Sequence, residues 1–255
     1  MMLTQTKTAK VSSANFLKKV VTKIPELKSL ADIKLEILCN LDSTDINSEL
    51  WIKLAEKIHA KWNQFDGFVI IHGTDTLSWT ACALAFFLEK LTKPIVLTGS
   101  QRPLEALRND GRANIIDAIE LATKGIPEVM VCFDSQVHRA TRVTKYSNEH
   151  LLAFKSFNAP LLGRFGVSFK ANQKSLDAVI AESKRHLPIL NLKLNTNIIM
   201  IPCLPSVKLT LPFIQSLLSS YEGIILQGFG SGNLPLNEKS WYQLCEKAFA
   251  KKIPV

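Results

Sequence analysis

The sequence lacks the features that mark membrane-spanning, secreted and zinc-binding proteins. It has no apolar run approaching the roughly 18 residues that a membrane helix needs, and its first ten residues are polar rather than a signal core. Its five cysteines are odd in number and form no Cys-x-x-Cys pair, so we expect reduced core cysteines rather than disulfides. These absences predict a cytoplasmic protein that has no membrane partner.

A concentrated basic patch is also missing. Lys and Arg number 31 against 22 Asp and Glu, which gives a net charge of +9, but no run contains five or more basic residues. Nucleic-acid binding requires clustered positive charge, so we expect no nucleic-acid partner. With 47% hydrophobic and 21% charged residues, the chain has the composition of a globular protein.

Several catalytic and cofactor motifs are absent as well. No Gly-x-Ser-x-Gly elbow occurs, which argues against an α/β-hydrolase. The glycine-rich segment 228–233 lacks the Lys-Ser/Thr of a phosphate-binding P-loop and the full spacing of a dinucleotide site. His72 has no second His or Cys at ligand spacing. We therefore expect neither a metal nor a bound nucleotide.

What the sequence does contain is an alternation of strands and helices. Short apolar runs at 67–71, 94–98 and 128–133 read as buried strands, and 76–91 and 108–123 read as the helices between them. This order predicts an α/β fold whose parallel strands are joined by right-handed crossovers. Ligands bind such sheets beyond the carboxyl ends of the strands, so the loops that follow these runs are the candidate site.

The remaining elements are expected on both sides of this section. Before it, we predict a helix over 14–21, a strand over 33–38 and a helix over 48–62, and after it an irregular stretch with short strands over 134–194. Strands at 197–201 and 223–226 and helices at 211–219 and 237–251 complete the prediction. We place a boundary near 180–195, which gives domains 1–185 and 195–255.

Polar clusters lie in the expected ligand-binding loops. Thr74 and Asp75 follow the first apolar run, where they could cap the next helix or bind an ammonium group and present a hydroxyl. Lys145 follows the third run, either as part of a solvated basic face or as a base acting on that hydroxyl.

Two further loops carry polar groups. Asp42, Ser43 and Thr44 suit a turn, and they also suit the carboxylate end of a small substrate. The Gly99-Ser100 turn could be an ordinary tight turn, or it could offer backbone N–H groups to an anion.

Taken in order, these motifs resemble the L-asparaginase/glutaminase family, and 66–124 looks most like its bacterial type I, cytoplasmic branch. The matching motifs are Asp42-Ser43, His72-Gly-Thr-Asp-Thr76, Thr98-Gly-Ser-Gln101, Arg108-x-Asp-Gly, Lys145 and Gly230-x-Gly-Asn233-x-Pro. The resemblance implies a larger N-terminal parallel-sheet domain with helices on both faces, and a smaller C-terminal α/β domain.

The resemblance also implies roles. Thr74, Asp75 and Lys145 match the family's catalytic triad, in which Lys145 would activate Thr74 and Asp75 would bind the substrate ammonium. Asp42, Ser43 and Thr44 match the loop that holds the substrate, L-asparagine. Asn233 matches a small-domain residue near the site of a homo-dimer or homo-tetramer. No metal or organic cofactor is implied.

The sequence departs from the family pattern at one important place. The family begins with a strand that ends in Thr-Gly-Gly-Thr and supplies the usual acylated threonine, and this motif does not occur here. We therefore expect a chain truncated at both ends, since 253–255 reads as the opening of a further strand. Three functions stay open: an asparagine amidohydrolase, an inactive fragment or pseudoenzyme that keeps the amino-acid-binding residues, and the asparaginase-like subunit of a tRNA-dependent amidotransferase.

Overall fold

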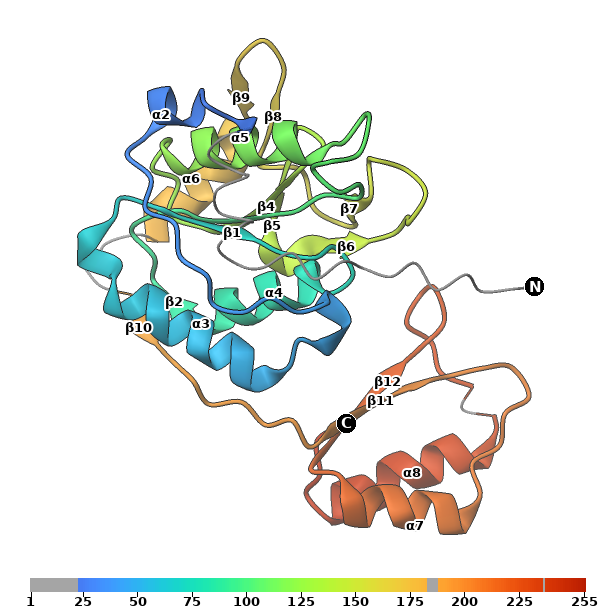
Figure 1. The fold of residues 1–255 in the computed structure, drawn as a ribbon. Coiled ribbons are helices and arrows are strands. Elements are labelled where there is room, and N and C mark those ends of the chain that lie inside the picture. Colours follow the sequence, from blue (N-terminus) through green and yellow to red (C-terminus); the bar gives the residue numbers. More distant parts are fainter. Residues whose placement is uncertain (1–22, 183–187, 236) are drawn as a thin grey trace. The chain divides into compact units, whose positions relative to one another are not determined.

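The computed structural model describes residues 23–182, 188–235 and 237–255 (Figure 1). The chain forms two compact units, one ending at Leu192 and one spanning Lys193–Val255. The predicted helix over 14–21 lies outside the described residues.

The first unit is built around a mixed six-stranded sheet. Its strand order is β1-β3-β4-β5-β8-β9, in which β1, β3 and β4 are parallel and β5, β8 and β9 continue the sheet in antiparallel pairs. The strands are β1 (Phe68–Ile71), β3 (Ile95–Thr98), β4 (Val129–Phe133), β5 (Gln136–Arg139), β8 (Gly163–Phe165) and β9 (Phe169–Ala171). The predicted α/β fold is confirmed, and the parallel strands are the three apolar runs.

Helices cover both faces of this sheet, because successive side chains of a strand point to opposite faces. Ile95 and Leu97 pack into one core with α3 (Ser48–Ala60) and α4 (Leu77–Phe87). Val96 packs into the other core with α5 (Gly111–Ala122) and α6 (Gln173–Glu182).

The predicted strand over 33–38 is wrong. Exposure alternates along this segment, as the sequence pattern requires, but the backbone forms no strand ladder with any described part of the chain. Alternation reports which side chains face the core, whereas a strand also needs a neighbour for its N–H and C=O groups. The segment is instead an extended connection after the short helix α2 (Leu27–Leu30), and Ile33 packs against a third core cluster.

Two predicted helices are shorter than the sequence suggested. The helix α5 begins at Gly111 rather than near Arg108, because Arg108 has a φ of 60°, which is incompatible with a right-handed helix. The helix α4 ends at Phe87, after which β2 (Leu88–Glu89) pairs with β10 (Ile189–Leu190). Single-turn 3-10 helices occur at Ser43–Asp45, Trp62–Gln64 and Ala140–Arg142.

The stretch expected to be irregular contains a hairpin that matters for the site. Strand β6 (Val143–Lys145) pairs antiparallel with β7 (Phe154–Ser156), and Lys145 lies opposite Phe154. The ring of Phe154 is buried and lies 4.8 Å from the ring of Phe133, at the end of β4. This aromatic contact anchors the hairpin beside the carboxyl end of the parallel sheet.

The second unit is a small α/β layer. Strands β11 (Ile198–Pro202) and β12 (Gly223–Gln227) are parallel and are joined by α7 (Leu211–Ser220), as predicted, and α8 (Lys239–Ala250) follows. Trp241 and Leu244 are fully buried in the core of this unit. Residues 253–255 form no strand, although the N–H of Ile224 donates to the carbonyl of Pro254 at 2.9 Å.

Candidate active site

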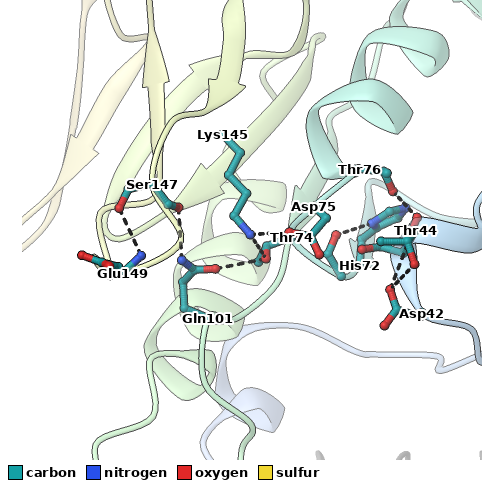
Figure 2. A network of polar contacts seen from close by, with 12 residues as sticks. Asp42, Thr44, His72, Thr74, Asp75, Thr76, Gln101, Lys145, Ser147 and Glu149 are labelled. Carbon is teal, nitrogen blue, oxygen red and sulfur yellow. Dashed lines mark hydrogen bonds and ion pairs between the residues drawn. The ribbon is translucent and has the colours of Figure 1, made fainter. Parts of the chain in front are cut away.

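The polar residues predicted in separate loops gather at one end of the parallel sheet. Thr74 and Asp75 lie in the loop between β1 and α4, and Gln101 follows β3 (Figure 2). Parallel strands end at a common edge, so the loops that follow them converge there. Lys145 reaches the same place from the β6–β7 hairpin.

Lys145 is the residue that joins this cluster. Its Nζ donates to Thr74 Oγ1 at 2.8 Å and to Asp75 Oδ1 at 2.6 Å. The lysine side chain is 16% exposed, whereas that of Asp75 is 58% exposed. A shielded amine therefore contacts both a hydroxyl and a carboxylate that remains open to solvent. That arrangement suits proton transfer at the hydroxyl and binding of a cation at the carboxylate.

Gln101 orients the hydroxyl from the opposite side. Thr74 Oγ1 donates to Gln101 Oε1 at 3.0 Å, and Gln101 Nε2 donates to the carbonyls of Ser147 and His150 at 3.3 and 3.2 Å. The two carbonyls can only accept, so they fix which end of the amide faces Thr74. The Thr74 hydroxyl thus accepts from the lysine and donates to the amide.

The turn after β3 carries an internal anion. Backbone N–H groups of Gln101 and Arg102 donate to the two carboxylate oxygens of Asp110, each at 2.9 Å. Asn114 donates to Asp110 Oδ2 at 3.1 Å and to the Gly99 carbonyl at 3.0 Å. The internal carboxylate of Asp110 thus occupies the N–H groups of Gln101 and Arg102 and ties down the loop that carries Gln101, while anion binding by the Gly99-Ser100 turn stays a prediction.

The predicted substrate-holding loop lies against the same cluster. Asp42 Oδ1 accepts from the N–H and the hydroxyl of Thr44 at 2.9 and 2.8 Å, and these bonds lower the pKa of the Asp42 carboxyl. Thr76 Oγ1 donates to the carbonyl of Ser43 at 2.6 Å. Asp42 and Thr44 are exposed, so their remaining hydrogen-bonding capacity faces solvent.

Glycines allow these loops to approach one another. A Cβ on Gly73 would lie 2.7 Å from the Cβ of Ser43, and a Cβ on Gly99 would lie 2.2 Å from the carbonyl oxygen of His72. Both distances are far below van der Waals contact, so only glycine fits. The two positions explain why Ser43 and His72 can pack directly on neighbouring loops.

Asn233 lies in the second unit, in a turn closed by a 2.9 Å hydrogen bond from the Phe229 N–H to the Asn233 carbonyl. Its predicted role near the site stays a prediction.

Two contributors were not identified from the sequence. The side chain of Gln101 and the buried Asp110 were each part of a motif, but their contacts join positions 4 to 49 residues apart. Gln101 lies three residues after the end of β3, and a polar residue in such a loop does not specify a partner.

Within the described residues, no group of three or more His, Cys, Asp or Glu side chains could hold a metal ion. No helix in the same part of the chain is long and apolar enough to cross a membrane.

The fold and this cluster define an α/β protein in which a lysine contacts a threonine at the carboxyl end of parallel strands. The family model described as "Asparaginase, N-terminal" matches residues 1–177. The chain belongs to the asparaginase family, as the sequence motifs predicted.

Relatives and solved structures agree with this assignment. The chain is 40% identical over 197 residues to an L-asparaginase from Dirofilaria immitis, covering 76% of this chain and 32% of the relative. It is 44% identical over 131 residues to L-asparaginase 1 from Escherichia coli, covering 51% and 39%. The structure of L-asparaginase I from Vibrio cholerae matches with a TM-score of 0.81 and 32% identity, covering 94% of this chain and 73% of that one. The chain thus spans 32% and 39% of the length of these two curated relatives.

Proposed function

We propose that this protein is an amidohydrolase, which converts L-asparagine and water to L-aspartate and ammonia by threonine-dependent acyl transfer. The observation that carries the proposal is the position of Lys145 Nζ, within hydrogen-bonding distance of both Thr74 Oγ1 and Asp75 Oδ1. A base in contact with a hydroxyl is the arrangement that activates an oxygen nucleophile.

The reaction proceeds in two steps, which are formation of an aspartyl ester and its hydrolysis. With Lys145 in its neutral form, the lysine accepts the Thr74 proton while the Thr74 oxygen attacks the side-chain amide carbon of asparagine. The C–N bond then breaks, and the nitrogen takes the proton and leaves as ammonia, so that an aspartyl ester remains. Water attacks the ester, aspartate departs, and the threonine regains its proton. Thr74 is the hydroxyl that Lys145 contacts, and it is the residue to which we assign this activation.

The same geometry supports amino-acid binding. The exposed carboxylate of Asp75 binds the substrate α-ammonium, because a charge-assisted hydrogen bond to a carboxylate is favourable at an accessible site. The Asp42–Thr44 loop holds the backbone end of the substrate. We further propose that the protein assembles as a homo-dimer or homo-tetramer and that Asn233 contributes to substrate binding in that assembly.

The decisive measurement is ammonia release from asparagine and from glutamine by the full chain. Lys145→Met and Thr74→Val should abolish release, since each removes one partner of the activating contact. Lys155→Met is the matched control: Lys155 lies on the neighbouring strand β7 opposite Thr144 and contacts the Phe157 ring, so activity should persist. Equal activity of the wild type and Lys145→Met would refute the proposal.

A second candidate function is binding of an acidic or amide amino acid without turnover. It is favoured by one observation, the exposure of Asp42, Thr44 and the Asp75 carboxylate, whose polar groups can hold an amino acid whether or not it is hydrolysed. Calorimetry with L-aspartate separates the two. Binding that is lost in Asp75→Ala, with no ammonia release by the wild type, supports this second function. Release that begins only when a Thr-Gly-Gly-Thr strand is joined upstream supports the first function for the extended protein.

A further inference from the structure

His72, at the end of β1, takes part in a chain of hydrogen bonds that leads away from the site. Its Nδ1 lies 2.7 Å from the carbonyl oxygen of Gly73, and its Nε2 lies 2.9 Å from Thr80 Oγ1 on α4. Trp51 Nε1, on α3, lies 2.9 Å from the same hydroxyl. This series of hydrogen bonds thus links two helices on one face of the sheet to the loop that carries Thr74.

The chemistry of these atoms fixes the direction of every hydrogen bond. A carbonyl oxygen only accepts, so His72 Nδ1 carries a hydrogen, and an indole nitrogen only donates, so Trp51 donates to Thr80. The hydroxyl of Thr80 then directs its own hydrogen to Nε2. The neutral imidazole with its hydrogen on Nδ1 satisfies all four groups, whereas the other tautomer would place two hydrogens between His72 and Thr80 or leave the Gly73 carbonyl without this donor.

The bond at Gly73 acts on Thr74 through the peptide plane. The Gly73 carbonyl and the Thr74 N–H belong to one trans peptide, so they are rigidly coupled and point in opposite directions. A hydrogen bond that holds the Gly73 oxygen therefore also fixes the direction of the Thr74 N–H. Gly73 lacks a side chain, and it would otherwise be the most freely rotating residue of this loop.

We propose that His72 is a positioning residue: held in its Nδ1–H tautomer by Thr80, it fixes the Gly73–Thr74 peptide and thereby aims Thr74 at Lys145. This inference rests on the proposed role of Thr74 but concerns a residue that contacts neither substrate nor Lys145. Its packing supports it, since Thr80 is buried and the His72 carbonyl is pressed against Gly99.

The first test reads the tautomer and needs no ligand. In the full chain labelled with ¹⁵N-histidine, NMR should show a protonated Nδ1 and an unprotonated Nε2 for His72 near neutral pH, with His72→Gln identifying its signals. A protonated Nε2 in the neutral ring would overturn the proposal. This result does not depend on whether the chain hydrolyses or binds anything.

The second test separates positioning from general stability. Thr80→Val removes the donor to Nε2, whereas Trp51→Phe removes a neighbouring bond and leaves the Thr80–His72 contact intact. We expect Thr80→Val to shift the amide signal of Thr74 and to weaken L-aspartate binding about tenfold, the equivalent of one lost hydrogen bond. Thr80→Ser should restore both the amide signal of Thr74 and the affinity for L-aspartate. Trp51→Phe should leave the amide signal in place and change the affinity by no more than about twofold.

The outcomes keep the two proposals apart. Equal effects of Thr80→Val and Trp51→Phe on the Thr74 amide would refute the positioning role. Failure of the wild type to bind aspartate would refute the proposed function, while the tautomer and the Thr74 amide shift would still decide whether His72 positions the peptide.

Discussion

The parallel and antiparallel halves of the main sheet contribute differently to the site. The parallel strands β1 and β3 end in rigid loops that carry Thr74 and Gln101, held by Gly73, Gly99 and the buried Asp110. The antiparallel half begins at β5, and the chain leaves it for the β6–β7 hairpin that brings Lys145. The parallel half presents the hydroxyl and the separate β6–β7 hairpin delivers the amine, so the chemistry depends on how the sheet and the hairpin are held together.

Removing the amine should produce the largest effect. Lys145→Met keeps the apolar stem of the side chain but deletes the contacts to Thr74 and Asp75, and we expect ammonia release to fall on the order of 1000-fold. Steady-state kinetics in a form that turns over would measure this. Circular dichroism should show an unchanged fold, and a loss of activity smaller than about tenfold would mean that the β6–β7 hairpin does not supply the base.

Acid should lower the stability of the protein through a buried histidine in the antiparallel half. His138 on β5 is fully buried, and burial, aided by the positive Arg164, lowers its pKa from 6.5 to about 4. The folded state disfavours protonation of His138. The contribution of the neutral ring to the free energy of unfolding is therefore fully present above about pH 6.5, and it is lost as the pH falls towards 4. The loss amounts to roughly 3 kcal/mol from this group.

Urea unfolding between pH 7 and 4 would measure this decline. His138→Gln should flatten the profile without abolishing the slope, because the pKa of the partly buried His72 is also lowered by burial and acts with the same sign. An unchanged slope in His138→Gln would assign the acid sensitivity to other groups.

An added methyl group in the parallel half should lower the free energy of unfolding by about 2 kcal/mol. Gly99→Ala places a Cβ 2.2 Å from the His72 carbonyl oxygen, so two backbones must move apart. Gly166, in the β8–β9 turn of the antiparallel half, has no atom within 4 Å of such a Cβ. Gly166→Ala should therefore change the free energy of unfolding by less than about 0.5 kcal/mol. Equal costs in chemical denaturation would show that Gly99 is not a close-packed contact.

The smallest expected effect lies where the two halves meet. Gln101→Leu removes the acceptor for the Thr74 hydroxyl and the donor to the Ser147 and His150 carbonyls, and we expect about a tenfold loss of aspartate affinity or turnover. Gln101→Glu keeps an acceptor for Thr74 but no longer donates to the two carbonyls. If the Thr74 contact dominates, Gln101→Glu should retain more function than Gln101→Leu.

The parallel half was predictable from the sequence because its signals are local. Continuous apolar runs mark β1, β3 and β4, and the intervening helices follow from their spacing. Thr74 and Asp75 lie in the loop after β1, as predicted, because they follow such a run within four residues. The extended segment 33–38 was misread as a strand because its side chains alternate in exposure, while pairing depends on a neighbour elsewhere in the chain.

The α/β fold, the family and the polar residues at the ends of the strands follow from the amino-acid sequence, since each depends on short apolar runs or short motifs. Only the tertiary structure decided that Lys145 lies 2.8 Å from a hydroxyl 71 residues earlier, and that Gln101 and His72 hold the Thr74 loop from two sides. Such contacts arise from the packing of Phe154 on Phe133 and from the convergence of parallel strands, and these are properties of the folded chain as a whole.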